Sequence, residues 1–181
     1  MLAGSSDAEF SIKNFPQQRK EVARGLGIGE TVEKAKVYLD MCCFNRPYDD
    51  QTQPRIQFEA AAKLMIQALI VDDQINLVWS YVLDFENSKN PFPEKREAIL
   101  AFKGFAHEIV VPGQEIEKVA RGLQSKGLKA YDSLHVACAI FAGCDYFLTV
   151  DDRVLNRQIE DIVVTDPVDF INQLLKEGRV P

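Results

Sequence analysis

Short apolar runs alternate with longer amphipathic segments over most of this 181-residue chain. From Lys36 onward, runs rich in β-branched and aromatic residues predict strands: VYL, INLVWS, EIVV, YFLTV and DIVVT. Between them, apolar residues three or four positions apart predict helices, as in RIQFEAAAKLMIQALI, EKREAILAFKGF and QEIEKVARGLQ. Strands that alternate with helices indicate an α/β fold in which a parallel sheet is covered on both faces.

Residues 1–35 break this pattern. They are polar and contain Gly25, Gly27 and Gly29 within a few positions. We therefore expect an N-terminal appendage over 1–35 that is dispensable for chemistry, followed by one domain over 36–177. A chain of this length is enough for one domain with a real core.

Composition narrows the class of protein. With 46% hydrophobic and 27% charged residues the chain resembles an ordinary soluble protein, and no apolar run approaches the roughly 20 residues of a membrane span. The first fifteen residues lack a cationic start followed by an apolar core, so we expect a cytoplasmic protein without a membrane partner. Four cysteines without zinc-site spacing are expected to be free thiols, namely Cys42, Cys43, Cys138 and Cys144.

The net charge of −6 argues against a protein that coats nucleic acid non-specifically, because such proteins carry a basic excess. It is compatible with a nucleic-acid enzyme whose acidic site holds cations.

Aspartates follow two of the expected strands. Asp40 ends the first strand, and Asp151 with Asp152 ends the fourth. Asp132 lies near the start of the helix before the fourth strand. That helix is expected to bury a face made of Ala130, Leu134, Ala137, Cys138 and Phe141. Because ligands bind outside the carboxyl ends of the strands in such sheets, these acids mark a candidate site.

Each acid alone has a structural interpretation as a favourable charge or cap at a helix N-terminus. Asp152 in particular is suited to cap the helix RVLNRQ. Three carboxylates on one edge repel one another, however, unless a cation lies between them. Magnesium and manganese fit because they prefer oxygen ligands from a few carboxylates. His135 is a candidate further ligand, although a packed histidine that supports a ligand is the preferred interpretation, and His107 has no such neighbours.

Other carboxylate and nucleotide sites do not match the sequence. A phosphatase with an aspartyl nucleophile needs D-x-D after its first strand, and here the letters from Asp40 are DMC. A receiver domain needs a lysine after the last strand, where this chain has TDP from Thr165. Neither G-x-x-x-x-G-K-[ST] nor G-x-G-x-x-G occurs, so a glycine-rich nucleotide loop has no support.

Five segments in order resemble the PIN-domain ribonucleases, the family that includes the VapC toxins. They are YLDMCCFNRP, SYVLDFE, AYDSLHVACA, FLTVDDRVLN and VVTDPVDFI, and together they span about residues 36 to 175. Asn45, Arg46 and Pro47 match a subtype with L-D-x-x-x-x-N-R-P at the first strand. The resemblance implies a Rossmann-like three-layer α/β/α sandwich with a central parallel sheet. It also implies four acids that bind one or two Mg²⁺ or Mn²⁺ ions and cut single-stranded RNA.

Three acids of that family pattern match single positions here. Asp40 corresponds to the first acid, Asp132 to the third and Asp151 to the fourth. The family's T-x-D motif selects Asp151 over Asp152 through Thr149.

The second acid has two candidates, Asp84 and Glu86, in the helix after the second strand. Two residues turn through about 200° on a helix, so only one can face the metal. We assign the role to Glu86, because the family places a glutamate about two turns after the strand and its longer side chain reaches further.

Positive residues suggest where RNA would lie, although a solvated helix face explains them equally well. The candidates for phosphate contacts are Arg46, Lys118, Arg121, Lys126 and Lys129.

The resemblance implies a metal-dependent endoribonuclease, the toxin of a toxin–antitoxin pair, with RNA as substrate, an antitoxin protein as partner and a second copy of the chain as a candidate partner. Two alternatives stay open. One is a non-catalytic PIN-like protein-interaction module, and the other is a DNA-directed nuclease on the same fold.

Overall fold

The structure is a computed structural model that describes residues 34–179. Most of the expected appendage over 1–35 lies outside the described residues. Its last residue, Ala35, is buried, and its carbonyl accepts a hydrogen bond from the amide of Asn76 at 2.8 Å.

Five parallel strands form one sheet in the order β3-β2-β1-β4-β5. The strands are β1 (Lys36–Leu39), β2 (Asn76–Ser80), β3 (Ala106–Val110), β4 (Tyr146–Leu148) and β5 (Val163–Thr165). The helices are α2 (Met41–Asn45), α3 (Pro54–Val71), α4 (Tyr81–Ser88), α5 (Pro93–Ala101), α6 (Gln114–Ser125), α7 (Ala130–Phe141), α8 (Asp152–Leu155) and α9 (Pro167–Lys176), with 3-10 turns η2 (Arg46–Tyr48) and η3 (Phe102–Phe105).

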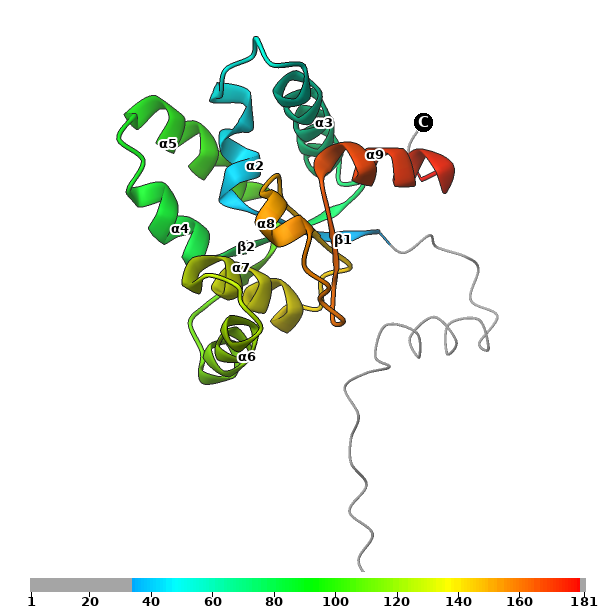
Figure 1. The fold of residues 1–181 in the computed structure, drawn as a ribbon. Helices are drawn as coiled ribbons and strands as arrows, with labels where there is room; N and C mark the ends of the chain where they lie inside the picture. The colour runs from blue at the N-terminus through cyan, green and yellow to red at the C-terminus, as the bar shows by residue number, and fades with distance from the viewer. Residues whose placement is uncertain (1–33, 180–181) are drawn as a thin grey trace, which may run out of the picture. The chain divides into compact units, whose positions relative to one another are not determined.

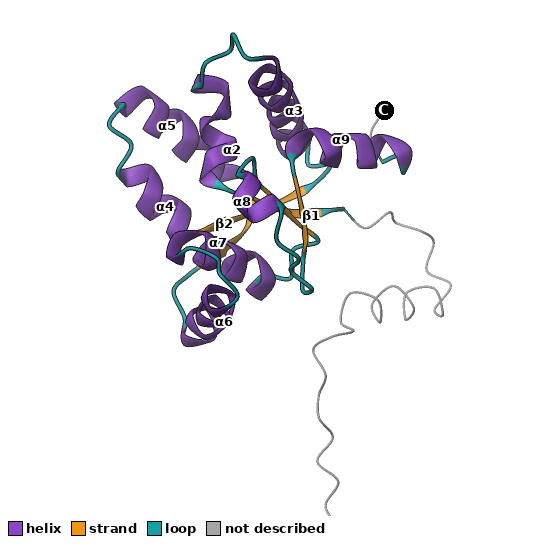
Figure 2. Ribbon diagram, in the orientation of Figure 1, coloured by secondary structure: helices purple, strands orange, loops and turns teal. Residues whose placement is uncertain are grey.

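Helices cover both faces of the sheet. Figure 1 shows α6 beside α7 on one side, and α3 beside α9 on the other. Figure 2 shows the strands between these two helical layers. The expected three-layer α/β/α sandwich with a central parallel sheet is therefore confirmed. The chain moves outward from β1 to β2 and β3, then returns to β4, so the strand order reverses between β1 and β4.

All five expected strands are present, but two helical expectations need correction. The segment EKREAILAFKGF is an α-helix only to Ala101 and continues as the 3-10 turn η3. On α7, Ala137 and Cys138 are buried as expected, whereas Ala130 and Phe141 are exposed. The reason is that α7 lies between the sheet and α6, so neighbours on several sides select its buried residues, and polar His135 is among them.

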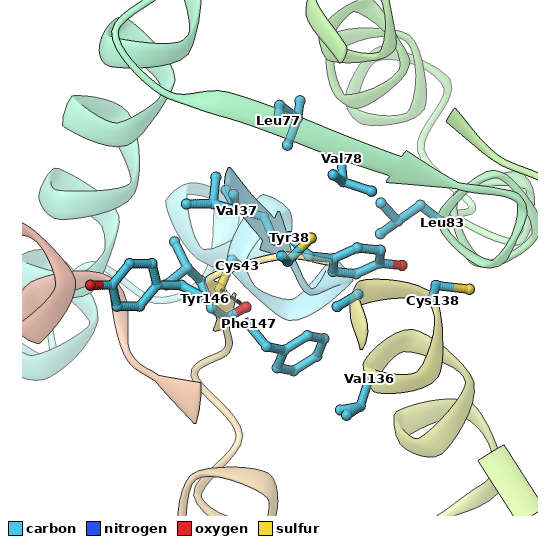
Figure 3. Close-up of a cluster of buried hydrophobic side chains, with 14 of the residues drawn as sticks. Val37, Tyr38, Cys43, Leu77, Val78, Leu83, Val136, Cys138, Tyr146 and Phe147 are labelled. Atoms are coloured by element: carbon cyan, nitrogen blue, oxygen red, sulfur yellow. Dashed lines mark hydrogen bonds between the residues drawn. The ribbon is translucent and has the colours of Figure 1, made fainter. Parts of the chain in front are cut away.

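The core is built from the strands and the faces of the helices against them. Figure 3 shows Tyr38 and Phe147 side by side, and their rings stack with centroids 5.6 Å apart. Both side chains are fully buried. The cysteines are free, as expected: Cys43, Cys138 and Cys144 are buried and Cys42 is half-buried. Within residues 34–179, no helix is both long enough and apolar enough to cross a membrane.

Lys63 is a charged residue inside this apolar surrounding. It lies on the buried side of α3 with 4% of its surface exposed, and its ammonium group is 5.5 Å from the ring centroid of Phe44 and 5.7 Å from that of Phe102. Burial lowers the pKa of Lys63 to about 8. The described part of the chain provides no carboxylate in an ion pair with it, so the charged form costs stability.

We expect Lys63→Met to stabilise the protein by roughly 1–3 kcal/mol at pH 7 in urea denaturation, because the variant keeps the apolar stem without a buried charge. The folded lysine has a pKa of about 8 and the unfolded one 10.5. Wild-type stability should therefore rise relative to the variant between these two pH values. Lys176→Met, at an exposed position at the end of α9, is the matched control and should show neither effect. A less stable Lys63→Met protein would contradict this account.

Candidate metal centre

Asp40 is the first residue after β1 and lies at the point where the strand order reverses. Its amide donates to the carbonyl of Leu148 on β4 at 2.9 Å. Its carboxylate is 8% exposed and accepts hydrogen bonds from Thr149 Oγ1 at 2.8 Å and from Cys42 Sγ at 3.1 Å. Thr149, the first residue of the T-x-D segment, thus donates a hydrogen bond to Asp40. These neutral donors hold the carboxylate in place without neutralising it.

Glu86 reaches the same region from α4. Ser80 caps this helix, because its Oγ accepts from the amides of Val82 at 3.2 Å and Leu83 at 3.4 Å. Glu86 is half-buried, and its Oε2 lies 2.8 Å from Nε2 of His135. The second acid assigned from the sequence therefore faces the side of the sheet edge occupied by α7.

His135 orients Glu86 through a buried hydrogen-bonded chain. Its Nδ1 is 2.6 Å from the Tyr38 hydroxyl, which is 2.6 Å from Ser80 Oγ. If Ser80 donates to Tyr38 and Tyr38 donates to Nδ1, then Nε2–H donates to Glu86, and every member of the chain is satisfied. His135 is 1% exposed. This is the packed, supporting histidine preferred from the sequence.

Asp40, Glu86 and His135 form a group that is compact enough for a metal ion. One ligand atom from each lies within 4.8 Å of the others. The His135 Nε2 is 3.9 Å from Asp40 Oδ1 and closer to Glu86.

Asp132 lies in the first turn of α7, as expected, and is half-buried. Burial raises the pKa of Asp132, and the carboxylates of Asp40 and Asp151 raise it further. Acids that follow β1 and β4 thus repel an acid on α7. Asp40, Asp132 and Asp151 are therefore close enough in space to interact electrostatically, although they are far apart in the sequence.

The expectation that Asp152 caps the helix after β4 is wrong by one residue. Asp151, not Asp152, is the N-cap of α8, and its Oδ1 accepts from the amide of Arg153 at 2.9 Å. Asp152 is the first residue of α8 and pairs with Arg55 at 2.6 Å. Asp151 takes the cap because its backbone is extended, with φ −85° and ψ 108°, which a cap residue requires.

Asp151 also forms an ion pair with the guanidinium group of Arg153, and this contact lowers the pKa of Asp151. The Arg153 side chain is 62% exposed, so the pair is of the kind that contributes little stability and exchanges readily. Asp151 is therefore held near the site by a partner that a stronger cation could replace.

Asp84, the competing second acid, has other partners. It accepts from Trp79 Nε1 at 2.9 Å and pairs with the ammonium of Lys103 at 2.8 Å. These contacts place its carboxylate against β2 and η3, whereas Glu86 contacts α7.

The donor set fits a hard divalent cation. All four assigned acids supply oxygen atoms, and the described residues bring no lysine or arginine into an ion pair with Asp40 or Glu86. Burial raises the pKa of Asp132, and the neighbouring carboxylates of Asp40 and Asp151 add to this rise, so the ionised group is costly without a cation. A bound ion would offset that repulsion.

The positive residues that were expected to contact RNA phosphates differ in their surroundings. Arg46 pairs with Glu59 at 2.8 Å, and Arg121 lies 3.6 Å from Glu117. Lys118 and Lys126 are exposed on or beside α6, and the carbonyl of Lys126 lies 3.5 Å from the guanidinium group of Arg157. Lys129 lies close enough to Asp151 to lower its pKa.

Sequence reasoning missed several residues at the site. Tyr38 reads as an ordinary strand residue, because only the fold brings it to His135 and Ser80. The cap signal of a serine before a helix could have identified Ser80. An open cleft of about 350 Å³ beside Glu86 was also not anticipated; among its lining residues are Asn45, Tyr48, Lys89, Phe92 and Lys95.

Comparisons with known proteins give a fold-level likeness. No family model matches the sequence, and no curated protein matches it either. Seven chains of solved structures do match. One is in the crystal structure of VapBC2 from Rickettsia felis bound to a DNA fragment from its promoter, with 14% identity and a TM-score of 0.47 over 72% of this chain and 98% of that chain. At this similarity, functional proposals rest on the residues of the site.

We expect Asp132→Asn to raise the melting temperature of chelator-treated protein at pH 7. The fold raises the pKa of Asp132 above its usual value, so the ionised form is disfavoured in the folded state and the penalty is complete at neutral pH. The penalty disappears as the pH falls below the usual pKa, so the two proteins should converge in acid. Added Mn²⁺ should stabilise the wild type more than the variant. Asp161→Asn, at an exposed position before β5, is the control; an equal gain there would contradict the explanation.

The assignment of the second acid can be tested by calorimetry with Mn²⁺. Glu86→Gln should weaken binding by at least about tenfold, because a charged ligand becomes neutral. Asp84→Asn should leave the affinity unchanged, since its carboxylate contacts Trp79 and Lys103. Weaker binding by Asp84→Asn with a normal Glu86→Gln protein would reverse the assignment.

Proposed function

We propose that this protein is a metal-dependent nuclease that hydrolyses phosphodiester bonds in single-stranded RNA. The observation that carries the proposal is the compact group of Asp40, Glu86 and His135, whose ligand atoms lie within 4.8 Å of one another. Asp132 supports it, because burial raises the pKa of Asp132 and the carboxylates of Asp40 and Asp151 raise it further. Carboxylates brought close together repel one another, and a bound cation would offset that repulsion.

Asp40, Glu86, Asp132 and Asp151 would hold Mg²⁺ or Mn²⁺. A bound ion would supply polarisation of the phosphoryl oxygen and a water molecule of lowered pKa. The chain supplies rigid carboxylates: Thr149 and Cys42 hold Asp40, and His135 holds Glu86. Asp151 would exchange its surface partner Arg153 for a bound cation, since the Arg153 side chain is largely exposed.

RNA as the substrate and an antitoxin as the partner rest on the five sequence segments that resemble PIN-domain ribonucleases. The similar solved structure is itself that of a VapBC2 complex. We propose that this chain is likewise the toxin of such a pair and is held inactive by a partner protein. A homodimer remains a prediction from the same resemblance.

The decisive measurement is cleavage of end-labelled single-stranded RNA and of DNA of the same sequence, with Mn²⁺ and then with chelator. RNA should be cut only with metal. Asp40→Asn, Asp132→Asn and Asp151→Asn should each lower the rate by at least about a hundredfold, because each loses a charge that the ion requires.

Asp161→Asn is the matched control, since it replaces an exposed aspartate at the amino edge of the sheet and should retain full activity. Circular dichroism should show that all the variants are folded. Full activity in any two of the three site variants would contradict the metal site. Preferential cleavage of DNA would support the DNA-directed alternative, and no cleavage of either would support a non-catalytic module.

A further inference from the structure

The cleft beside Glu86 is lined by aromatic and basic side chains, and also by the acidic residues Asp49 and Glu86. It opens between α2, η2 and the connection from α4 to α5, and its volume of about 350 Å³ is within the range of small-ligand sites. We call it the aromatic cleft and define it by Asn45, Tyr48, Lys89, Phe92 and Lys95.

Two rings in the aromatic cleft remain in contact with solvent. Tyr48 is 43% exposed and Phe92 is 54% exposed. The ammonium group of Lys95 lies 5.1 Å from the Tyr48 ring centroid and 4.5 Å from that of Phe92. These are cation–π distances, so the lysine is held close to both rings. No carboxylate among residues 34–179 forms an ion pair with Lys95, and its charge is therefore available to an anion.

A second exposed ring pair lies beside the acids. Phe85 precedes Glu86 in the chain, and Tyr131 precedes Asp132. Their rings stack with centroids 5.9 Å apart, and the ammonium group of Lys89 is 3.8 Å from the Phe85 centroid. Lys89 also lines the aromatic cleft. Exposed rings with lysines over them thus adjoin the acidic cluster.

Flat rings next to lysines that form no ion pair within residues 34–179 match the chemistry of unpaired nucleotides, although Lys89 also donates a hydrogen bond to the Tyr131 hydroxyl at 3.3 Å. Proteins that bind single strands stack bases on aromatic side chains and contact the backbone with positive charge. We propose that the aromatic cleft binds an unpaired nucleobase of the substrate, stacked on Tyr48 and Phe92, while Lys89 and Lys95 contact its phosphates. The inference rests on the proposed function and names the element that would select single-stranded RNA.

The arrangement explains selection against duplexes. A paired base is stacked between its neighbours, so it reaches the rings only after unstacking, which costs energy. The amide of Asn45 offers both a donor and an acceptor to a base edge. Exposed rings also occur at protein interfaces, but a lysine without an acidic partner over each ring pair favours a ligand that carries phosphates.

The test measures binding without cleavage, in the full-length Asp40→Asn protein. The probe is a fluorescein-labelled single-stranded RNA of about ten nucleotides, followed by fluorescence anisotropy. Tyr48→Leu and Phe92→Leu keep an apolar side chain but lose the flat ring, and each should weaken binding by about 5- to 150-fold. Phe141→Leu is the matched control: this ring is 57% exposed at the end of α7 that leads to the amino end of β4, and its loss should change nothing.

A second readout separates stacking from general damage to the fold. One abasic position is moved along the RNA until it weakens binding most. When Tyr48 and Phe92 are both changed to leucine, the abasic position should no longer reduce the RNA affinity, because the stacking between base and rings is already absent. Lys95→Gln should reduce the slope of log affinity against log salt by about 0.7, which corresponds to one phosphate contact on a single strand.

The outcomes distinguish this inference from the proposed function. Unchanged RNA affinity in the ring variants, or an abasic loss that persists in the double variant, would overturn the cleft proposal and assign the rings to a protein contact. Failure of the wild-type protein to cleave RNA would overturn the proposed function, whereas binding by the Asp40→Asn protein still decides whether the cleft holds a base.

Discussion

Parallel pairing on both sides of β1 determines the rest of this structure. Val37 lies opposite Leu77 on β2 and opposite Tyr146 on β4, so β1 is the central strand. The strand order reverses there, and the connections that leave β1 and β4 run to different parts of the fold. Asp40 is the first residue beyond β1, and the amide that places it is bonded to β4. The site is therefore a consequence of the sheet order.

A series of hydrogen-bonded side chains connects the buried core to Glu86. It runs from Ser80 through Tyr38 and His135 to Glu86, with each neighbouring pair within hydrogen-bond distance. Three of the four members are buried, and a fully satisfied buried network specifies one arrangement. The same serine caps α4, so the helix that carries Glu86 and the histidine that orients it share one anchor.

Two electrostatic features of the molecule are unfavourable, one for its stability and one for binding of RNA. Burial and then the carboxylates of Asp40 and Asp151 raise the pKa of Asp132. The protein as a whole carries a charge of −6, which repels a polyanion. The proposed binding of RNA therefore depends on local features. The features that would offset the general repulsion are a cation among the acids, the ammonium groups of Lys89 and Lys95 over their rings, and ring stacking that is insensitive to charge.

The sequence by itself determined the α/β class, the five strands and the positions of Asp40 and Glu86 relative to them, because residue periodicity and strand ends are local properties. Tertiary structure decided the details that depend on contacts between distant segments. It made Asp151 the cap in place of Asp152, paired Asp84 with Lys103 and buried His135 on α7. It also assembled the aromatic cleft from α2, η2, α5 and the connection between α4 and α5. Apart from the cap, these partners lie far apart in the chain, so no local pattern records them, and packing alone brings them together.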